Sequence, residues 1–302
     1  MTGEPRPLHE PVLTAEVLQY LQPERGGLFV DCTVGVGGHS RALLDAGATR
    51  VIGLDRDLDA LAHARTVLAP WGDRAQLVHA DYRSIEDVLD RRHVSLVDGA
   101  LADLGVSSLQ LDAPGRGFSF QRDEPLDMRM DRSGGETAAD LVARTGEQEL
   151  ADAIFAYGEE RFSRRIARAI VLARAEAPIA TTARLASVVR RAMPRRGHMR
   201  IDPATRTFQA LRIWVNCELD GLGAFLQTAA RRLRSGARLV VITFHSLEDR
   251  IVKHTLRGLE RTEAVVKVLT KKPVLPGDDE VGRNPRARSA KLRAAERVFG
   301  PV

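Results

Sequence analysis

The chain has 302 residues, of which 45 are basic and 40 acidic, giving a formal net charge of +5. Apolar residues at 44% and charged residues at 28% are globular proportions, which excludes wholesale disorder. The two cysteines, Cys32 and Cys217, are too few and too far apart for a disulfide framework or a cysteine-rich zinc site, so no metal is expected. No segment resembles a signal peptide or a membrane span, so we expect a soluble, cytoplasmic protein that makes no membrane contact.

Short apolar runs alternate with helical stretches in the first third of the chain. Helices are predicted at Ser40–Ala46 and Leu58–Leu68. The predicted buried strands are Leu28–Thr33, Val51–Asp55, Gln76–His79 and Asp98–Asp103. This alternation predicts an α/β fold with a doubly wound, parallel sheet, whose ligand lies at the carboxyl ends of the strands.

The next buried strand, Arg238–Phe244, follows only after 135 residues, far more than one crossover helix needs. Apolar residues at helical spacing fill much of this gap. We therefore predict a discontinuous sheet domain, residues 1–109 and 206–302, with an inserted α-helical subdomain at 110–205. A long helix from about Thr205 to Leu233 returns the chain to the sheet. The last two of seven strands are predicted at Ala264–Leu269 and Lys291–Val298.

The turn after the first predicted strand contains Gly35, Gly37 and Gly38. Glycines allow close approach of the backbone to a ligand, and the start of the next helix offers N–H groups. A dinucleotide-binding motif would have a third glycine where Ser40 stands, which disfavours a nicotinamide-dependent oxidoreductase. Asp31, ahead of the glycines, is instead typical of the first motif of class I methyltransferases.

An aspartate ends or follows each of the next predicted strands. Asp55 comes 18 residues after Gly37, where a carboxylate can accept hydrogen bonds from both ribose hydroxyls. Asp81 and Tyr82 follow the third strand, where methyltransferases commonly contact adenine, and Asp103 ends the fourth. Each aspartate alone could be a helix N-cap, but their order at successive strand ends favours S-adenosylmethionine as the ligand.

Nine stretches spread almost from end to end of the chain form motifs that methyltransferases in general lack. They are His9–Leu13, Gly37–Arg41, Asp103–Ser108, Arg116–Phe120, Pro125–Asp131, Tyr157–Ile170, Pro203–Asn216, Phe244–Lys253 and Asn284–Arg293. In these stretches the sequence closely resembles the bacterial MraW family, which methylates the N4 amine of a cytidine in the decoding region of small-subunit ribosomal RNA.

This resemblance implies a class I (Rossmann-like) methyltransferase that uses S-adenosylmethionine and acts on the small ribosomal subunit through its 16S rRNA. The family usually has phenylalanine where this chain has Tyr82, and either ring can stack on adenine. Carried over by position, the cofactor contacts are Gly37, Gly38, His39, Asp55, Tyr82, Asp103 and Gln110.

The residues after the fourth predicted strand leave the proton acceptor open. Amine methyltransferases often have an acidic residue or asparagine, two prolines and an aromatic residue there. This chain has Asp103-Leu-Gly-Val106, without the prolines or the aromatic ring. Asp103 could accept a hydrogen bond from the cytidine amine, and so could a backbone carbonyl at Leu104–Gly105, while Asp103 has the alternative role of binding the cofactor.

Three further residues are candidates for contact with the RNA substrate. Phe118 and Phe120 could stack on the target base, or they could pack the inserted helices. His245 follows the fifth predicted strand and could touch the RNA or orient the base. Ser246–Asp249 reads as a capping box for the next helix, which predicts structural roles for Ser246 and Asp249.

Basic residues are concentrated in two runs, Arg190–Arg200 and Arg283–Arg293. Such runs suit a polyanion, because cations near phosphates release condensed counterions. The alternative is a solvated face. In the first run, Arg195, Arg196 and Arg200 are the candidate RNA contacts.

A non-catalytic ribosome-assembly factor that retains the methyltransferase fold is the alternative function. Intact Gly37, Asp55 and Asp103 argue against such a loss of activity. The oligomeric state is left open, a homodimer included.

Overall fold

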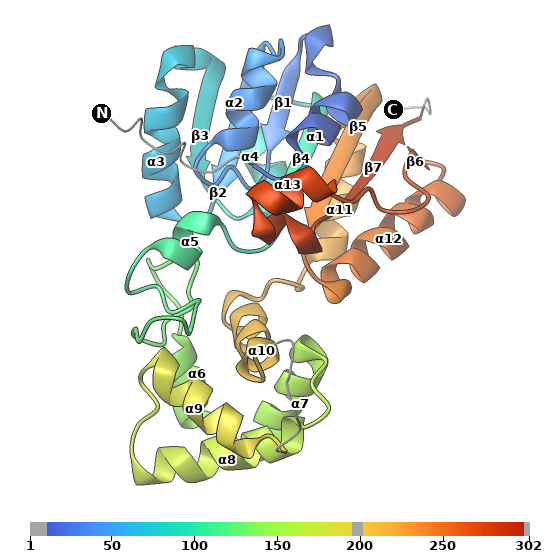
Figure 1. The fold of residues 1–302 in the computed structure, drawn as a ribbon. Helices are drawn as coiled ribbons and strands as arrows, with labels where there is room; N and C mark the ends of the chain where they lie inside the picture. Colours follow the sequence, from blue (N-terminus) through green and yellow to red (C-terminus); the bar gives the residue numbers. More distant parts are fainter. Residues whose placement is uncertain (1–10, 195–201, 299–302) are drawn as a thin grey trace. The chain divides into compact units, whose positions relative to one another are not determined.

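The computed structural model describes residues 11–194 and 202–298, which divide into two compact units. The first unit comprises Met1–Gly105 and Asp220–Val302, and the second comprises Val106–Leu219. Figure 1 shows that the first unit contains the sheet and that the second is largely helical.

The first unit contains seven strands: β1 (Leu28–Asp31), β2 (Arg50–Asp55), β3 (Ala75–His79), β4 (Val97–Asp103), β5 (Leu233–Thr243), β6 (Val266–Val268) and β7 (Lys291–Arg297). They form one sheet in the order β3-β2-β1-β4-β5-β7-β6. Strands β1 to β5 pair in parallel, whereas β7 runs antiparallel to both β5 and β6. The predicted seven-stranded, mostly parallel sheet is confirmed.

Helices cover both faces of this sheet (Figure 1). One face packs against α1 (Thr14–Leu21), α2 (Gly38–Asp45) and α3 (Leu58–Leu68). The other face packs against α4 (Ile85–Asp90), α11 (Leu222–Arg231) and α12 (Ser246–Arg261). Because both faces are covered, the central strands are apolar on both sides: Val30 and Phe29 are both buried, one in each core.

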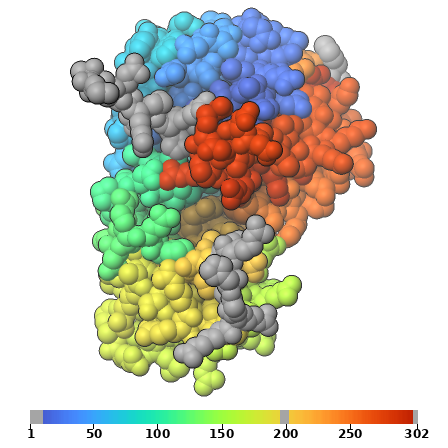
Figure 2. All heavy atoms as spheres, viewed as in Figure 1, coloured from blue at the N-terminus to red at the C-terminus, as the bar shows by residue number. Residues whose placement is uncertain are grey.

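The C-terminal part of the first unit adds α13 (Asp278–Arg283) and the 3-10 turn η4 (Pro285–Ser289). The carboxylate of Glu280 in α13 accepts a 2.7 Å hydrogen bond from the backbone N–H of Leu13, next to α1. In the space-filling view, the red segment that contains α13 lies against the blue N-terminal segments (Figure 2). This hydrogen bond thereby joins the segment before α1 to the C-terminal part of the first unit.

The second unit contains α5 (Ser108–Asp112), α6 (Ala138–Arg144), α7 (Glu147–Gly158), α8 (Ser163–Glu176), α9 (Thr182–Ala192) and α10 (Ala204–Asn216). Its helices surround a separate apolar core, which includes Ile154, Ile170 and Leu211. A Cβ on Gly158 would lie 2.5 Å from the Arg206 carbonyl oxygen, so this glycine lets α7 and α10 pack closely.

The predicted long helix from Thr205 to Leu233 is wrong. The chain forms two helices, α10 and α11, because Cys217 (φ 48°) and Gly221 (φ 68°) take left-handed conformations between them. The second unit therefore includes α10 and ends at Leu219, not at residue 205, and it begins at Val106 instead of residue 110.

The helices in the described ranges include none with the length and apolar character needed to cross a membrane.

Candidate functional site

The glycine turn lies between β1 and α2. Gly35 (φ 52°) and Gly37 (φ 93°) take left-handed conformations that favour glycine. A Cβ on Gly37 would also lie 3.2 Å from the Leu68 side chain, so the turn fits tightly against α3. Gly37 is the N-cap of α2 and supplies no side-chain cap, which leaves the first N–H groups of that helix suited to bind a ligand.

Asp31 at the end of β1 holds this turn together. Its carboxylate accepts a 2.7 Å hydrogen bond from the Ser40 hydroxyl and a 3.2 Å bond from the Thr33 N–H. Burial raises the pKa of Asp31, while the neighbouring His39 and the Ser40 hydrogen bond oppose that rise. Ser40 stands where a dinucleotide-binding motif has its third glycine, and its buried hydroxyl donates a hydrogen bond to Asp31. The spacing of the glycines did not predict this bond.

Asp55 brings the end of β2 to the glycine turn. Its Oδ2 accepts a 2.8 Å hydrogen bond from the Gly35 N–H, and its Oδ1 accepts one of the same length from the Asp57 N–H. Burial raises the pKa of Asp55 to about 6, although both of these bonds favour the ionised form. A carboxylate has about four acceptor positions, so each oxygen can still accept a bond from a hydroxyl group.

His39 and Asp103 meet at the same edge of the sheet. The His39 ring is 5% exposed, and its Nε2 lies 3.5 Å from Oδ2 of Asp103, longer than an ordinary hydrogen bond. Within the described residues, neither ring nitrogen of His39 nor Oδ1 of Asp103 has a hydrogen-bond partner. The backbone N–H of Asp103 donates to the Thr33 hydroxyl at 2.7 Å, which fixes β4 against the turn.

Unsatisfied buried polar atoms are costly, about 1–3 kcal/mol for each group. Three such atoms beside one glycine turn indicate a site shaped for a polar ligand. The structure thus brings together Gly37, Gly38, His39, Asp55 and Asp103 of the predicted cofactor residues.

Asp81 and Tyr82 lie just beyond β3. Asp81 accepts two 2.7 Å bonds from the Arg83 guanidinium and one from the Arg83 N–H. Burial opposes ionisation of Asp81, but these bonds and the charge of Arg56 outweigh it and lower the pKa of this carboxyl. The Tyr82 ring packs on Phe225, with centroids 4.7 Å apart and a 56° tilt. Its stacking on adenine stays a prediction.

His245, not Ser246, is the N-cap of α12, so the predicted capping box is one residue out of place. Its Nδ1 accepts a 3.4 Å bond from the Glu248 N–H, while Glu248 accepts a 3.0 Å bond from the Phe244 N–H. The sequence signal failed because histidine is an uncommon N-cap and a serine stands next to it. Asp249 takes no part in the cap and instead pairs with the Arg293 guanidinium at 2.7 Å. RNA contact by His245 stays a prediction.

In the second unit, Gln110 forms a capping box with Ser107 at the start of α5. The Gln110 side chain accepts a 2.9 Å bond from the Ser107 N–H, and the Ser107 hydroxyl accepts a 3.2 Å bond from the Gln110 N–H. Gln110 is 4% exposed. A cofactor contact at Gln110 stays a prediction.

The two candidate stacking rings have different surroundings. Phe118 is 8% exposed and belongs to the core of the helical unit, which supports its packing role. Phe120 is half-buried, meets Phe208 edge-on at 4.8 Å between centroids, and lies 5.5 Å below the Arg190 guanidinium. Stacking of Phe120 on a base stays a prediction.

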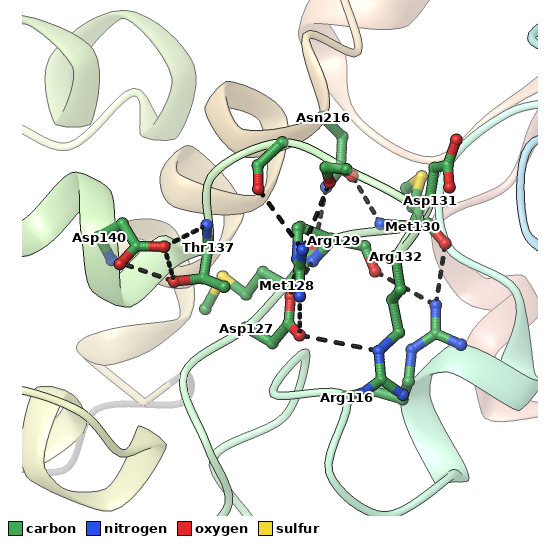
Figure 3. Close-up of polar contacts among 12 residues, drawn as sticks. Arg116, Asp127, Met128, Arg129, Met130, Asp131, Arg132, Thr137, Asp140 and Asn216 are labelled. Atoms are coloured by element: carbon green, nitrogen blue, oxygen red, sulfur yellow. Dashed lines mark hydrogen bonds and ion pairs between the residues drawn. The ribbon is translucent and has the colours of Figure 1, made fainter.

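A loop before α6 is held from a distance by Asn216, at the end of α10 (Figure 3). The Asn216 side-chain oxygen accepts a 2.8 Å bond from the Met130 N–H, and its NH₂ group donates to the carbonyls of Met128 and Arg212. Met128 has φ 63°, which marks a tight turn in this loop. No spacing in the sequence links residues 128 and 216, so this clamp was missed.

The same loop carries an ion-paired aspartate. Asp127 accepts bonds of 2.7 and 3.0 Å from Arg129, and Arg132 lies 3.8 Å away (Figure 3). Burial opposes ionisation of Asp127, but the Arg129 hydrogen bonds outweigh it and lower its pKa. The Arg116 side chain is buried and donates to the Arg129 and Met130 carbonyls.

Arg195, Arg196 and Arg200 lie outside the described residues. Arg190, at the start of the same basic run, pairs with Asp202 at 2.7 Å.

The strand order, the antiparallel β7 and the glycine turn with aspartates at neighbouring strand ends define a class I methyltransferase fold. Comparison with known proteins is consistent with this class. The chain belongs to the MraW methylase family, whose model matches residues 6–298.

Curated relatives match almost the whole chain. A ribosomal RNA small subunit methyltransferase H of Sorangium cellulosum is 55% identical, with 98% of this chain and 94% of the relative covered. The protein of the same name from Cyanothece is 53% identical over 98% and 96% of the two chains. A solved structure described as a putative rRNA methylase of Clostridium thermocellum aligns over 95% and 94% of the chains at 11% identity and a TM-score of 0.43, which is too low to inform single residues.

Proposed function

We propose that this protein transfers a methyl group from S-adenosylmethionine to the N4 amine of a cytidine in the decoding region of 16S rRNA. The observation that carries the proposal is the cluster of Asp55, His39 and Asp103 around the glycine turn, in a chain of the MraW methylase family. The names of its relatives, small subunit methyltransferases, support the RNA substrate.

The residues of the sheet unit fit this cofactor. S-adenosylmethionine carries ribose hydroxyls and positive charge, and the site offers carboxylate oxygens for both. Asp55 would accept bonds from the ribose, and the unsatisfied atoms of Asp103 and His39 would hold the polar methionine end. Gly37 and Gly38 would let the backbone approach, and Tyr82 would stack on adenine.

The bound cofactor supplies an electrophilic methyl group on a sulfonium. The cytosine amine is a weak nucleophile, because its lone pair is delocalised into the ring, so the protein must hold it in line with that methyl group. An oriented acceptor would take a hydrogen bond, and finally the proton, from the amine as charge develops. Asp103 and the backbone carbonyls of Leu104–Gly105 are the candidates. We favour a cofactor role for Asp103, since no proline pair follows it.

We further propose that the helical unit recognises RNA. Residues 110–205, the range expected from sequence, include Phe120 with the Arg190 guanidinium over its ring. Arg195, Arg196 and Arg200 continue this basic segment, and His245 is a further candidate for RNA contact. A substrate on the small subunit would place the protein in the cytoplasm.

Methyl transfer to isolated subunits tests the proposal. Small subunits that lack the modification, incubated with the protein and methyl-labelled S-adenosylmethionine, should incorporate label, whereas large subunits should not. Naked 16S rRNA is the matched substrate, because it shows whether the assembled particle is required. Cofactor binding in calorimetry without any methyl transfer would favour the alternative, a non-catalytic assembly factor. Sedimentation of the same preparation would decide whether it is a homodimer.

A further inference from the structure

A cavity of about 230 Å³ in the sheet unit is lined by residues of α12, of the edge strand β6 and of its neighbour β7. It lies at the opposite end of the sheet from β3, which precedes Tyr82 (Figure 1). Its lining includes five cations and a single carboxylate: Lys253, Arg257, Arg261, Lys271, Arg293 and Glu260.

Three of these cations form a row on one helix. Lys253, Arg257 and Arg261 are four residues apart on α12, so they share a face of the helix, and neighbours are about 6 Å apart along its axis. Lys271 adds a fourth cation from the segment after β6. Within the described part of the chain, none of these four side chains pairs with a carboxylate.

The acidic groups near the cavity are already engaged. Glu260 accepts a 2.8 Å hydrogen bond from the Val268 N–H and so holds β6 to α12. Asp249 accepts bonds of 2.7 and 3.2 Å from Arg293, whose side chain is 7% exposed. Arg293 is therefore paired, and the four other cations outnumber Glu260, the single carboxylate of the lining, so the cavity carries a net positive charge.

We propose that this cavity and its row of cations bind successive phosphates of an RNA strand. This inference rests on the proposed function, which supplies RNA as the substrate. One small anion would need only one or two cations, whereas a row extending about 12 Å along a helix matches a polymer with repeated negative charge. Phosphate contacts of this kind position a strand without reading its sequence.

The test compares two triple variants of the full chain. The pocket variant carries Lys253→Gln, Arg257→Gln and Lys271→Gln. The control variant carries Arg50→Gln, Arg65→Gln and Arg91→Gln, which removes the same charge from exposed sites without ion pairs among the described residues. Binding to small subunits is measured between about 50 and 200 mM salt. Thermal melting and S-adenosylmethionine affinity, expected to be unchanged, show that both variants are folded.

The pocket variant should bind subunits at least about tenfold more weakly, and the slope of log affinity against log salt should be shallower by about 2–3. The control variant should keep nearly the wild-type slope. A Lys253→Arg, Lys271→Arg variant, which retains the charges, should keep it too.

Equal slopes for the pocket and control variants would overturn the proposal. It would also be overturned if titration with inorganic phosphate lost its signal in the pocket variant while the subunit slope stayed at the wild-type value, since the cavity would then be a small-anion site. Wild-type methyl transfer is measured in parallel. Its absence would remove the proposed function, while the slopes, which measure binding alone, would still decide on the cavity.

Discussion

The aspartates that end β1, β2 and β4 lie at one edge of the sheet in different surroundings. Asp31 is 1% exposed and accepts bonds from Ser40 and Thr33 of its own turn, so it supports the site from within. Asp55 accepts two backbone bonds and retains capacity for more. Asp103 has an unsatisfied oxygen beside the unsatisfied ring of His39. The roles we assign, turn support, ribose binding and contact with the reactive end of the cofactor, follow this order.

Cofactor affinity should depend on the protonation of Asp55. Because its pKa is raised to about 6, a growing fraction of the carboxyl is protonated below that pH and cannot accept bonds from both ribose hydroxyls. S-adenosylmethionine affinity should therefore fall by up to about tenfold per pH unit between pH 6 and 5, with proton release on binding. Calorimetry in buffers of different ionisation enthalpy measures the affinity and the number of protons released. An affinity that does not change from pH 5 to 8 would contradict ribose binding by Asp55.

The raised pKa of Asp55 also makes the stability of the folded protein depend on pH. Between about pH 4 and 6 the folded protein holds a proton on Asp55 that the unfolded chain has released, so this group's contribution to stability decreases as pH rises through that window. Asp55→Asn is the matched control, because it should remove both pH dependences while weakening cofactor binding.

Asp103→Asn separates the two roles open to that residue. If the carboxylate binds the methionine end, affinity should drop and saturating cofactor should restore most of the single-turnover rate. If it accepts from the amine, the rate at saturation should instead fall roughly 10- to 1,000-fold. We expect the first result. A large loss at saturating cofactor and subunit would reassign Asp103 as the proton acceptor.

At the scale of elements, hydrophobic runs bounded by polar residues located all seven strands and gave α3 its bounds, but β5 begins at Leu233 and not at the predicted Arg238. The break between α10 and α11 was missed: Cys217 takes the left-handed conformation without a sequence signal, but Asp220-Gly221 is a dipeptide typical of turns. The N-cap of α12 was misplaced for a similar reason, since a favoured residue, Ser246, stands beside the true cap. Local propensity located the elements, but contacts between distant residues decided their ends.

Some residues of the candidate site could likewise be predicted from sequence, whereas others depend on contacts that the sequence does not reveal. Strand-end aspartates and the glycine turn were found because topology brings carboxyl ends to one edge of the sheet. The bond from Ser40 to Asp31 and the Asn216 clamp were not, because each depends on side-chain placement that no periodicity encodes.

The Asn216 clamp should contribute substantially to the stability of the helical unit. Asn216→Ala removes hydrogen bonds to Met128, Met130 and Arg212 and leaves buried backbone groups unpaired, which should cost roughly 2–3 kcal/mol. Chemical denaturation measures the loss. Gln148→Ala is the control and should be nearly neutral, because among the described residues this exposed side chain bonds only Asp152. If the Asn216→Ala and Gln148→Ala variants had equal free energies of unfolding, a stabilising role for the Asn216 side chain would be contradicted.

At the scale of the whole molecule, the proposed cofactor site lies in the sheet unit, whereas RNA contacts are proposed in both units. Replacing Arg195, Arg196 and Arg200 by alanine should leave S-adenosylmethionine affinity intact and weaken subunit binding, with a shallower dependence on salt. Binding curves at several salt concentrations test this. A salt slope equal to that of the wild type would make this run a solvated face.

The central claim, methylation of a cytidine N4 amine by this chain, is tested most directly by nucleoside mass analysis. Unmodified small subunits are incubated with the protein and isotopically labelled S-adenosylmethionine, and their 16S rRNA is then digested. The account predicts label in N4-methylcytidine from the decoding region, and much less with Asp55→Asn at limiting cofactor. Label in a ring-methylated cytidine or in another nucleoside, or no label with bound cofactor and bound subunit, would contradict it.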